Sequence, residues 1–151
     1  NCTNAIFLCC KYLNVKEVTI PKQTYLSVPQ SIIHSGGTVK FEDRLWRGIY
    51  DLKPYPIWDS AKRLTSDMYI PGSYMCLSFH IKKTLSIGKG GAILTDDPED
   101  ITMLGWNMYM TPQQASHGLS LMQNYPKHVE DLGENGGYRD LTEFTIFGGK
   151  Q

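Results

Sequence analysis

The sequence predicts an α/β fold with a mostly parallel central sheet, because helical and strand patterns alternate along the first part of the chain. Two further observations support this class. The 151 residues include 41% hydrophobic and 20% charged side chains, which suits a single domain, residues 1–151, with a buried core. Several apolar runs also end in polar side chains, as strands do at the ligand-binding edge of an α/β sheet.

The first half of the chain predicts two helix–strand units. A cap at Thr3 or Asn4 begins the first helix, whose apolar residues recur at helical spacing. The second helix begins near Ser27, has Pro29 in its first turn and ends at the glycine pair 36–37. The strands that follow these helices are residues 17–21 and 38–41.

The second half predicts further strands that deliver polar residues. An apolar strand at residues 55–58 is followed by Asp59, and a strand at residues 75–79 is followed by one histidine and two lysines. Helices begin at Pro98 and Pro112, because a capping residue precedes each proline. The helix from Pro98 is expected to run through Met108, and the remaining segments are an irregular stretch at 44–56, a glycine-rich turn at 88–91, a strand at 92–95 and a helical segment within 141–147.

Charge and hydropathy exclude several classes of protein. The chain has 15 basic and 15 acidic side chains, and zero net charge argues against a nucleic-acid binder. No apolar run is long enough for a membrane span. The four cysteines have neither disulfide-framework nor metal-ligand spacing, which predicts reduced thiols in a cytoplasmic protein without a metal site.

A lysine pair and an aspartate at strand ends indicate a candidate site. Lys82 or Lys83, poised between a strand and a glycine-rich turn, could lose hydration and act as an amine nucleophile; both could equally be solvated surface lysines. Asp59 is either a turn cap or a functional charge. Together they suit pyridoxal phosphate (PLP), whose aldehyde needs a lysine and whose ring nitrogen needs a carboxylate.

The sequence also offers groups that could bind the phosphate and the ring of this cofactor. A helix start at Thr3 or Asn4 offers the backbone N–H groups that bind phosphate. The aromatic face of Tyr25 could lie against the ring.

Short motifs also occur in a recognisable order. The most specific is Ser78-Phe79-His80-Ile81-Lys82-Lys83, followed by a Gly-x-Gly-Gly turn at residues 88–91. Weaker motifs are Cys2-Thr3-Asn4-Ala5, Trp58-Asp59-Ser60-Ala61, Leu132-Gly133-Glu134-Asn135 and the segments 18–25 and 34–43. Together they resemble the DegT–StrS family of PLP-dependent nucleotide-sugar aminotransferases, which has the aspartate-aminotransferase fold type I.

The resemblance implies a three-layer sandwich like the large domain of fold type I, with an internal deletion around residues 44–56 and no small C-terminal domain. It implies that Lys83 binds the cofactor aldehyde and shuttles a proton, that Asp59 pairs with the ring nitrogen, and that His80 lies near the cofactor. The other implied contacts are Thr3, Asn4 and Ser78 at the phosphate, Ala61 and Tyr25 on the ring faces, Lys62 at the phenolic oxygen, and Asn135 at the phosphate in the neighbouring subunit.

The implied activity is transfer of an amino group from an amino acid such as glutamate to a keto-sugar nucleotide, by a homodimer, in polysaccharide biosynthesis. Two positions depart from the family: Lys62 stands where it has glutamine and Lys89 where it has glutamate. Loss of substrate-binding parts favours an alternative, an inactive relative that is a binding or structural protein or works with a partner chain. Retention of Asp59, Ser78 and Lys83 together favours the enzyme.

Overall fold

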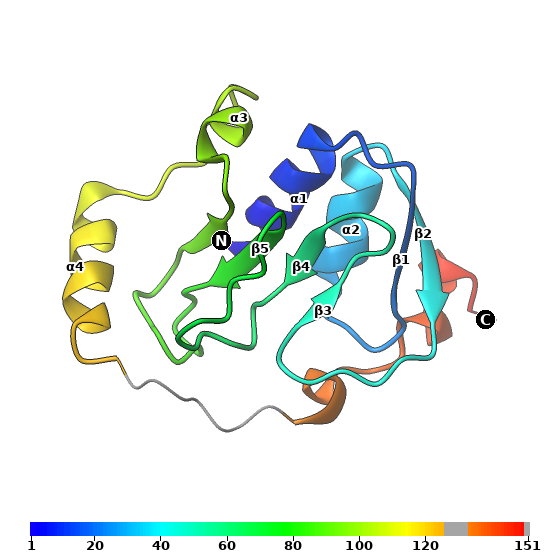
Figure 1. Ribbon diagram of the computed structural model, residues 1–151. Coiled ribbons are helices and arrows are strands. Elements are labelled where there is room, and N and C mark those ends of the chain that lie inside the picture. Colours follow the sequence, from blue (N-terminus) through cyan, green and yellow to red (C-terminus); the bar gives the residue numbers. More distant parts are fainter. Residues whose placement is uncertain (126–132, 150–151) are drawn as a thin grey trace.

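A computed structural model describes residues 1–125 and 133–149 of the chain, in which helices pack against two small sheets (Figure 1). The α-helices are α1 (Cys2–Tyr12), α2 (Ser27–His34), α3 (Pro98–Thr102) and α4 (Pro112–Met122). The strands are β1 (Glu17–Pro21), β2 (Thr38–Glu42), β3 (Tyr50–Asp51), β4 (Ile57–Asp59), β5 (Tyr74–Ser78) and β6 (Gly91–Leu94). Three short 3-10 helices follow near the C-terminus: η1 (Glu134–Gly137), η2 (Leu141–Glu143) and η3 (Thr145–Phe147).

The α/β class is confirmed, but the larger of the two described sheets is mixed rather than mostly parallel. Strands β1 and β2 form a parallel pair, and the order β3-β4-β5-β6 forms a second sheet. Within it β4 and β5 are parallel, whereas β3–β4 and β5–β6 are antiparallel. The connection at residues 52–56 is too short for the crossover that a parallel β3–β4 pair would need.

The two sheets are joined where β1 meets the segment after β3. The backbone N–H of Thr19 donates to the carbonyl of Lys53 at 2.8 Å, and the N–H of Lys53 donates back to Thr19 at 3.0 Å. This bridge places β1 beside the segment that links β3 to β4.

Most predicted elements are present, with differences at their ends. Helix α1 is capped by Asn1, whose Oδ1 accepts the backbone N–H of Asn4 at 2.9 Å, so the predicted caps lie inside the first turn. Helix α3 ends at Thr102 instead of continuing through Met108, since Gly105 takes a left-handed φ of 71°. Strand β3 was not predicted, because two residues are too few to show an alternation.

The core lies where α1 and α2 pack on the sheets. Its fully buried side chains stabilise the fold by about 1.5–3 kcal/mol each for the large aliphatic ones. Those with at most 1% exposure include Ile6, Cys9, Cys10, Val18, Ile20, Val28, Ile32, Leu52, Ile57, Met75 and Cys76. None of the helices among the described residues is long and apolar enough to cross a membrane.

Gly91 lets α1 approach β6 closely. A Cβ atom at Gly91 would lie 2.6 Å from the carbonyl oxygen of Leu77 and 2.6 Å from the carbonyl carbon of Asn1. Only glycine fits between these backbone segments. The N-terminal turn of α1 is thereby held beside the carboxyl end of β5.

Candidate functional site

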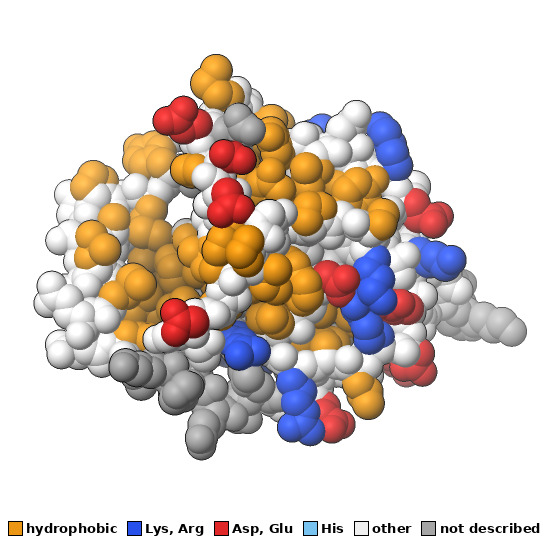
Figure 2. Space-filling view, viewed as in Figure 1, with side chains coloured by type: hydrophobic (Ala, Val, Ile, Leu, Met, Phe, Trp, Pro, Cys, Tyr) orange, Lys and Arg blue, Asp and Glu red, His pale blue; other side chains and the backbone are white. Residues whose placement is uncertain are grey.

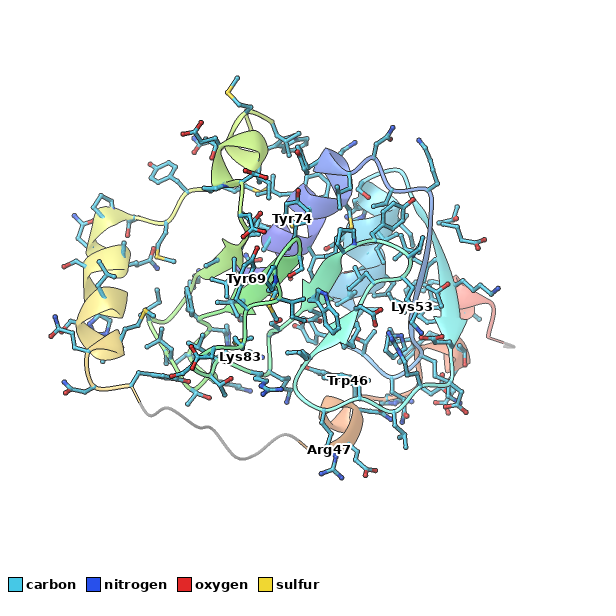
Figure 3. All side chains as sticks on the ribbon, in the orientation of Figure 1. Trp46, Arg47, Lys53, Tyr69, Tyr74 and Lys83 are labelled. Atoms are coloured by element: carbon cyan, nitrogen blue, oxygen red, sulfur yellow. The ribbon has the colours of Figure 1, made fainter. Side chains whose placement is uncertain are left out.

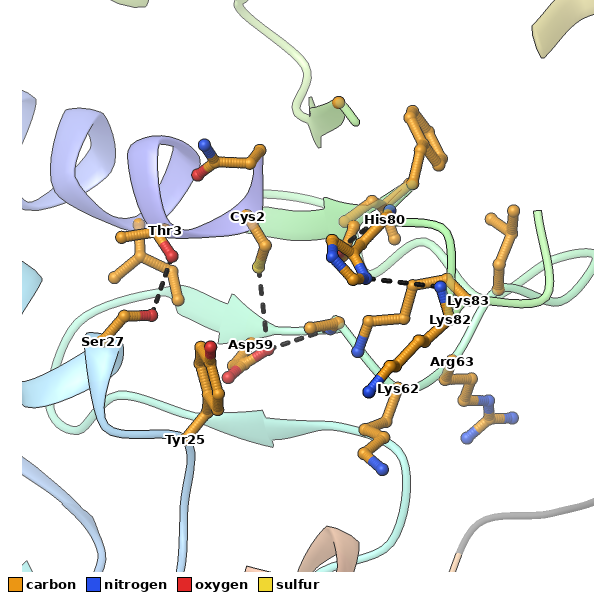
Figure 4. Close-up of a pocket in the computed structure, with 18 of the residues that line it drawn as sticks. Cys2, Thr3, Tyr25, Ser27, Asp59, Lys62, Arg63, His80, Lys82 and Lys83 are labelled. Carbon is orange, nitrogen blue, oxygen red and sulfur yellow. Dashed lines mark hydrogen bonds between the residues drawn. The ribbon is translucent and has the colours of Figure 1, made fainter. Parts of the chain in front are cut away.

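A cavity of about 840 Å³ opens where the carboxyl ends of β4 and β5 meet the first turn of α1 (Figure 4). The structure brings eight of the ten predicted site residues to its wall: Thr3, Tyr25, Asp59, Ala61, Lys62, Ser78, His80 and Lys83. The two predicted residues that do not line it are Asn4 and Asn135.

Asp59 ends β4 at the base of this cavity and is only 6% exposed. Its Oδ1 accepts the backbone N–H of Ala61 at 2.9 Å and lies 3.8 Å from the thiol of Cys2. Its Oδ2 accepts the hydroxyl of Tyr50 at 2.8 Å. Burial raises the pKa of Asp59, while the hydrogen bonds from Ala61 and Tyr50 and the charge of Lys83 oppose this rise.

Lys83 lies on the loop after β5 and faces the same cavity (Figures 3 and 4). Its backbone N–H donates to the carbonyl of His80 at 2.8 Å, which forms a turn that leaves Lys83 half-buried and Lys82 exposed. Burial lowers the pKa of Lys83, the nearby charge of Lys62 lowers it further, and Asp59 opposes both. A lysine with a depressed pKa has more of the neutral amine that acts as a nucleophile.

The first turn of α1 and the end of β5 offer anion-binding groups. Backbone N–H groups of a first helical turn lack partners within the helix and carry partial positive charge. Thr3 lines the cavity, its Oγ1 2.7 Å from Ser27 Oγ, and Ser78 at the end of β5 lines it as well. Asn4 instead faces a second cavity of about 230 Å³ between α1, β6 and α3, and its N–H is taken by the Asn1 cap.

Two tyrosine side chains line the cavity next to each other. Tyr25 and Tyr138 both line it, with ring centroids 5.7 Å apart, and the Nζ of Lys62 lies 5.2 Å from the Tyr138 centroid. Burial, with the nearby Asp59 charge, raises the pKa of Tyr138 to about 12, so its hydroxyl is neutral. Ala61 supplies a small apolar surface.

Asn135 is buried within its own chain. Its Oδ1 accepts the backbone N–H of Trp46 at 3.1 Å, and its Nδ2 donates to Gln23 Oε1 at 2.6 Å. Trp46 lies beside this C-terminal segment in Figure 3. The predicted contact of Asn135 with a partner's phosphate would require these bonds to open, and Leu132 of the same motif lies outside the described residues.

Sequence reasoning missed several residues of the site. Tyr50 sits on the two-residue strand and Tyr138 comes from a distant segment, so no local pattern marked either. The charge of the cavity was also missed. Its described lining holds five basic side chains, Lys62, Arg63, Lys82, Lys83 and Lys89, and Asp59 as the one acidic side chain.

The residues that line the cavity offer a partner for each reactive part of PLP. The buried, donor-bound carboxylate of Asp59 suits a protonated ring nitrogen, and the half-buried amine of Lys83 suits an aldehyde. The α1 turn and Ser78 suit a phosphate. Among residues 1–125 and 133–149, no three His, Cys, Asp or Glu side chains form a group that could hold a metal ion.

Comparisons with known proteins agree with this geometry. Residues 70–136 match the model of the DegT/DnrJ/EryC1/StrS aminotransferase family, which confirms the family resemblance over that segment. A solved structure from Bacillus cereus, assigned as a PLP-dependent aminotransferase, is similar with a TM-score of 0.62 at 18% identity, over 83% of this chain and 52% of that one. The fold is therefore shared, and this chain spans about half the length of that neighbour. No curated protein matches the chain.

Proposed function

From the match to the DegT/DnrJ/EryC1/StrS aminotransferase family and the shared fold, we propose that this chain binds PLP and acts as an aminotransferase. One observation carries the proposal: Asp59, the last residue of β4, and Lys83, on the loop after β5, face the same cavity and influence each other's pKa. A lysine and a buried carboxylate that face one cavity are the two groups that hold this cofactor.

The residues of the cavity would divide the work. When bound, PLP supplies an electron sink for the bonds around the α-carbon of an amino acid. The amine of Lys83 would hold the cofactor aldehyde and, once a substrate amino group has displaced it, would take and return the α-proton at Nζ, which its depressed pKa favours. Asp59 would balance the positive charge of the ring nitrogen, and Tyr25 and Tyr138 would offer aromatic surface to the ring.

The proposed substrates are an amino donor such as glutamate and a keto-sugar nucleotide acceptor. Five basic side chains exceed what one cofactor phosphate and Asp59 balance, and this excess supports anionic substrates. Arg63, Lys82 and Lys89 are the cavity cations that stand outside the proposed cofactor contacts, so they are the candidates for substrate carboxylate or phosphate groups.

The experiment is a titration of the purified chain with PLP, followed by absorbance, before and after addition of glutamate. The wild type and Lys82→Ala should develop the same absorbance band, and glutamate should shift it, whereas Lys83→Ala should develop none. A band that glutamate and other amino acids leave unchanged would support the inactive-relative alternative. Equal binding by the Lys83→Ala variant would overturn the proposal.

A further inference from the structure

Tyr50 lies directly beside Asp59 on the neighbouring strand. The two residues are opposite each other in the antiparallel β3–β4 pair, and the Tyr50 hydroxyl lies 2.8 Å from Asp59 Oδ2. Tyr50 is 2% exposed and does not line the cavity. Its hydroxyl therefore reaches the carboxylate from behind, on the side away from any ligand.

The directions of these hydrogen bonds follow from the number of protons available. A phenol has one proton, so when Tyr50 donates it to Asp59, its oxygen accepts the proton of the buried Thr24 hydroxyl. The backbone N–H of Ala61 donates to the other carboxylate oxygen. Asp59 thus sits at the end of a relay in which both carboxylate oxygens and the Tyr50 oxygen face a donor.

This arrangement disfavours the protonated acid. A proton on Oδ1 would point at the N–H of Ala61, and a proton on Oδ2 would require the hydroxyls of Tyr50 and Thr24 both to turn around. The other titratable groups that influence Asp59 or are influenced by it are Cys2 on α1, Cys76 on β5, Lys83 on the following loop and Tyr138 in the C-terminal segment.

We propose that Tyr50, with Thr24 behind it, is a positioning residue that keeps the buried Asp59 ionised and turned toward the cavity. The benefit to catalysis rests on the proposed function, since an ionised Asp59 is what a protonated ring nitrogen requires. The effect on Asp59 itself exists in the chain without any cofactor.

The test measures the pKa of Asp59 in the cofactor-free chain, by NMR titration of its side-chain carboxyl carbon. Tyr50→Phe removes the donor and should raise the proton affinity of Asp59 roughly tenfold. Thr24→Val should raise it less, and Thr24→Ser should restore the wild-type titration. Tyr138→Phe is the matched control, because this cavity tyrosine is near Asp59 without a described hydrogen bond to it, and it should leave the titration unchanged.

The possible results of this titration distinguish the role of Tyr50 from the proposed binding of PLP. If folded Tyr50→Phe titrates like wild type, or if Tyr138→Phe shifts Asp59 equally, the relay proposal is overturned. Should Tyr50→Phe fail to fold, the Thr24→Val and Thr24→Ser pair decides in the same way. Failure of the wild type to bind PLP, with the Tyr50→Phe shift present, would refute the proposed function alone.

Discussion

At the scale of single residues, burial distinguishes the two adjacent lysines of the SFHIKK motif. Both line the cavity, but Lys83 is half-buried while Lys82 is exposed. The family motif pointed to Lys83 by its position, but residue patterns alone left the pair undecided. The reason is physical: the hydrogen bond from Lys83 to His80 turns the loop, and no local pattern encodes that turn.

The charge of Lys62 should lower the pKa of Lys83. Replacing Lys62 by glutamine removes the nearby positive charge that lowers the pKa of Lys83, so that pKa should rise. The rise is measured as the pH dependence of Lys83 acylation by a small reagent, followed by mass spectrometry. Lys82→Gln is the matched control and should leave the curve of Lys83 in place; an unmoved curve in Lys62→Gln would contradict this prediction.

At the scale of elements, the sequence predicted those that carry their own start and stop signals. Helix α4 begins at Pro112 with Thr111 as its cap, as expected, and β1 has the predicted bounds. The features that the sequence did not predict depend on contacts between residues far apart in the chain. The pairing direction of β5 and β6 and the existence of β3 are set by which strands meet in space, and a two-residue strand has no period to detect.

The packing of α1 on β6 gives a prediction of its own. Gly91→Ala would place Cβ 2.6 Å from backbone atoms of Leu77 and Asn1, so the variant should unfold about 1–3 kcal/mol more easily and bind anions at α1 less well. Urea unfolding measures the loss. Gly118→Ala in α4 is the control: its Cβ would meet Ile87 at an ordinary 3.6 Å, and helix propensity should make it neutral or stabilising. Equal effects of the two substitutions would be inconsistent with this account.

At the scale of the whole molecule, Lys83 and Asp59 should shape the pH dependence of the stability of the fold. The lowered pKa of Lys83 means that the unfolded chain holds a proton that the folded chain has released, so this group's penalty fades as pH rises from its folded pKa toward the usual 10.5. Asp59, whose pKa is raised above 3.8, acts oppositely, and its penalty grows as pH rises above that value.

Lys83→Met should therefore flatten the alkaline part of the stability curve. Wild-type stability contains a contribution that increases with pH in that range, and the variant lacks it. Urea midpoints recorded from neutral to alkaline pH, with Lys82→Met as the reference, test the difference. An unchanged slope in Lys83→Met would show that the lysine is ordinary in the folded chain.

We also propose that the chain forms a homodimer. Figure 2 shows apolar side chains gathered around α3 and α4, where Met103, Tyr109 and Leu119 are 84%, 76% and 67% exposed. Sedimentation should show self-association that Tyr109→Asp with Leu119→Asp weakens. Ile146→Asp, an equally exposed substitution on η3, should not weaken it. A wild-type monomer at high concentration would contradict the proposal.

The central claim, that Lys83 holds PLP against Asp59, is tested most directly by locating the attachment. The purified chain is mixed with PLP, reduced with borohydride and digested, and the modified peptide is identified by mass spectrometry. The account predicts one equivalent of reduced cofactor on Lys83, little on the exposed Lys82, and a weaker yield in Asp59→Asn. Modification spread evenly over exposed lysines, or absent from Lys83, would contradict it.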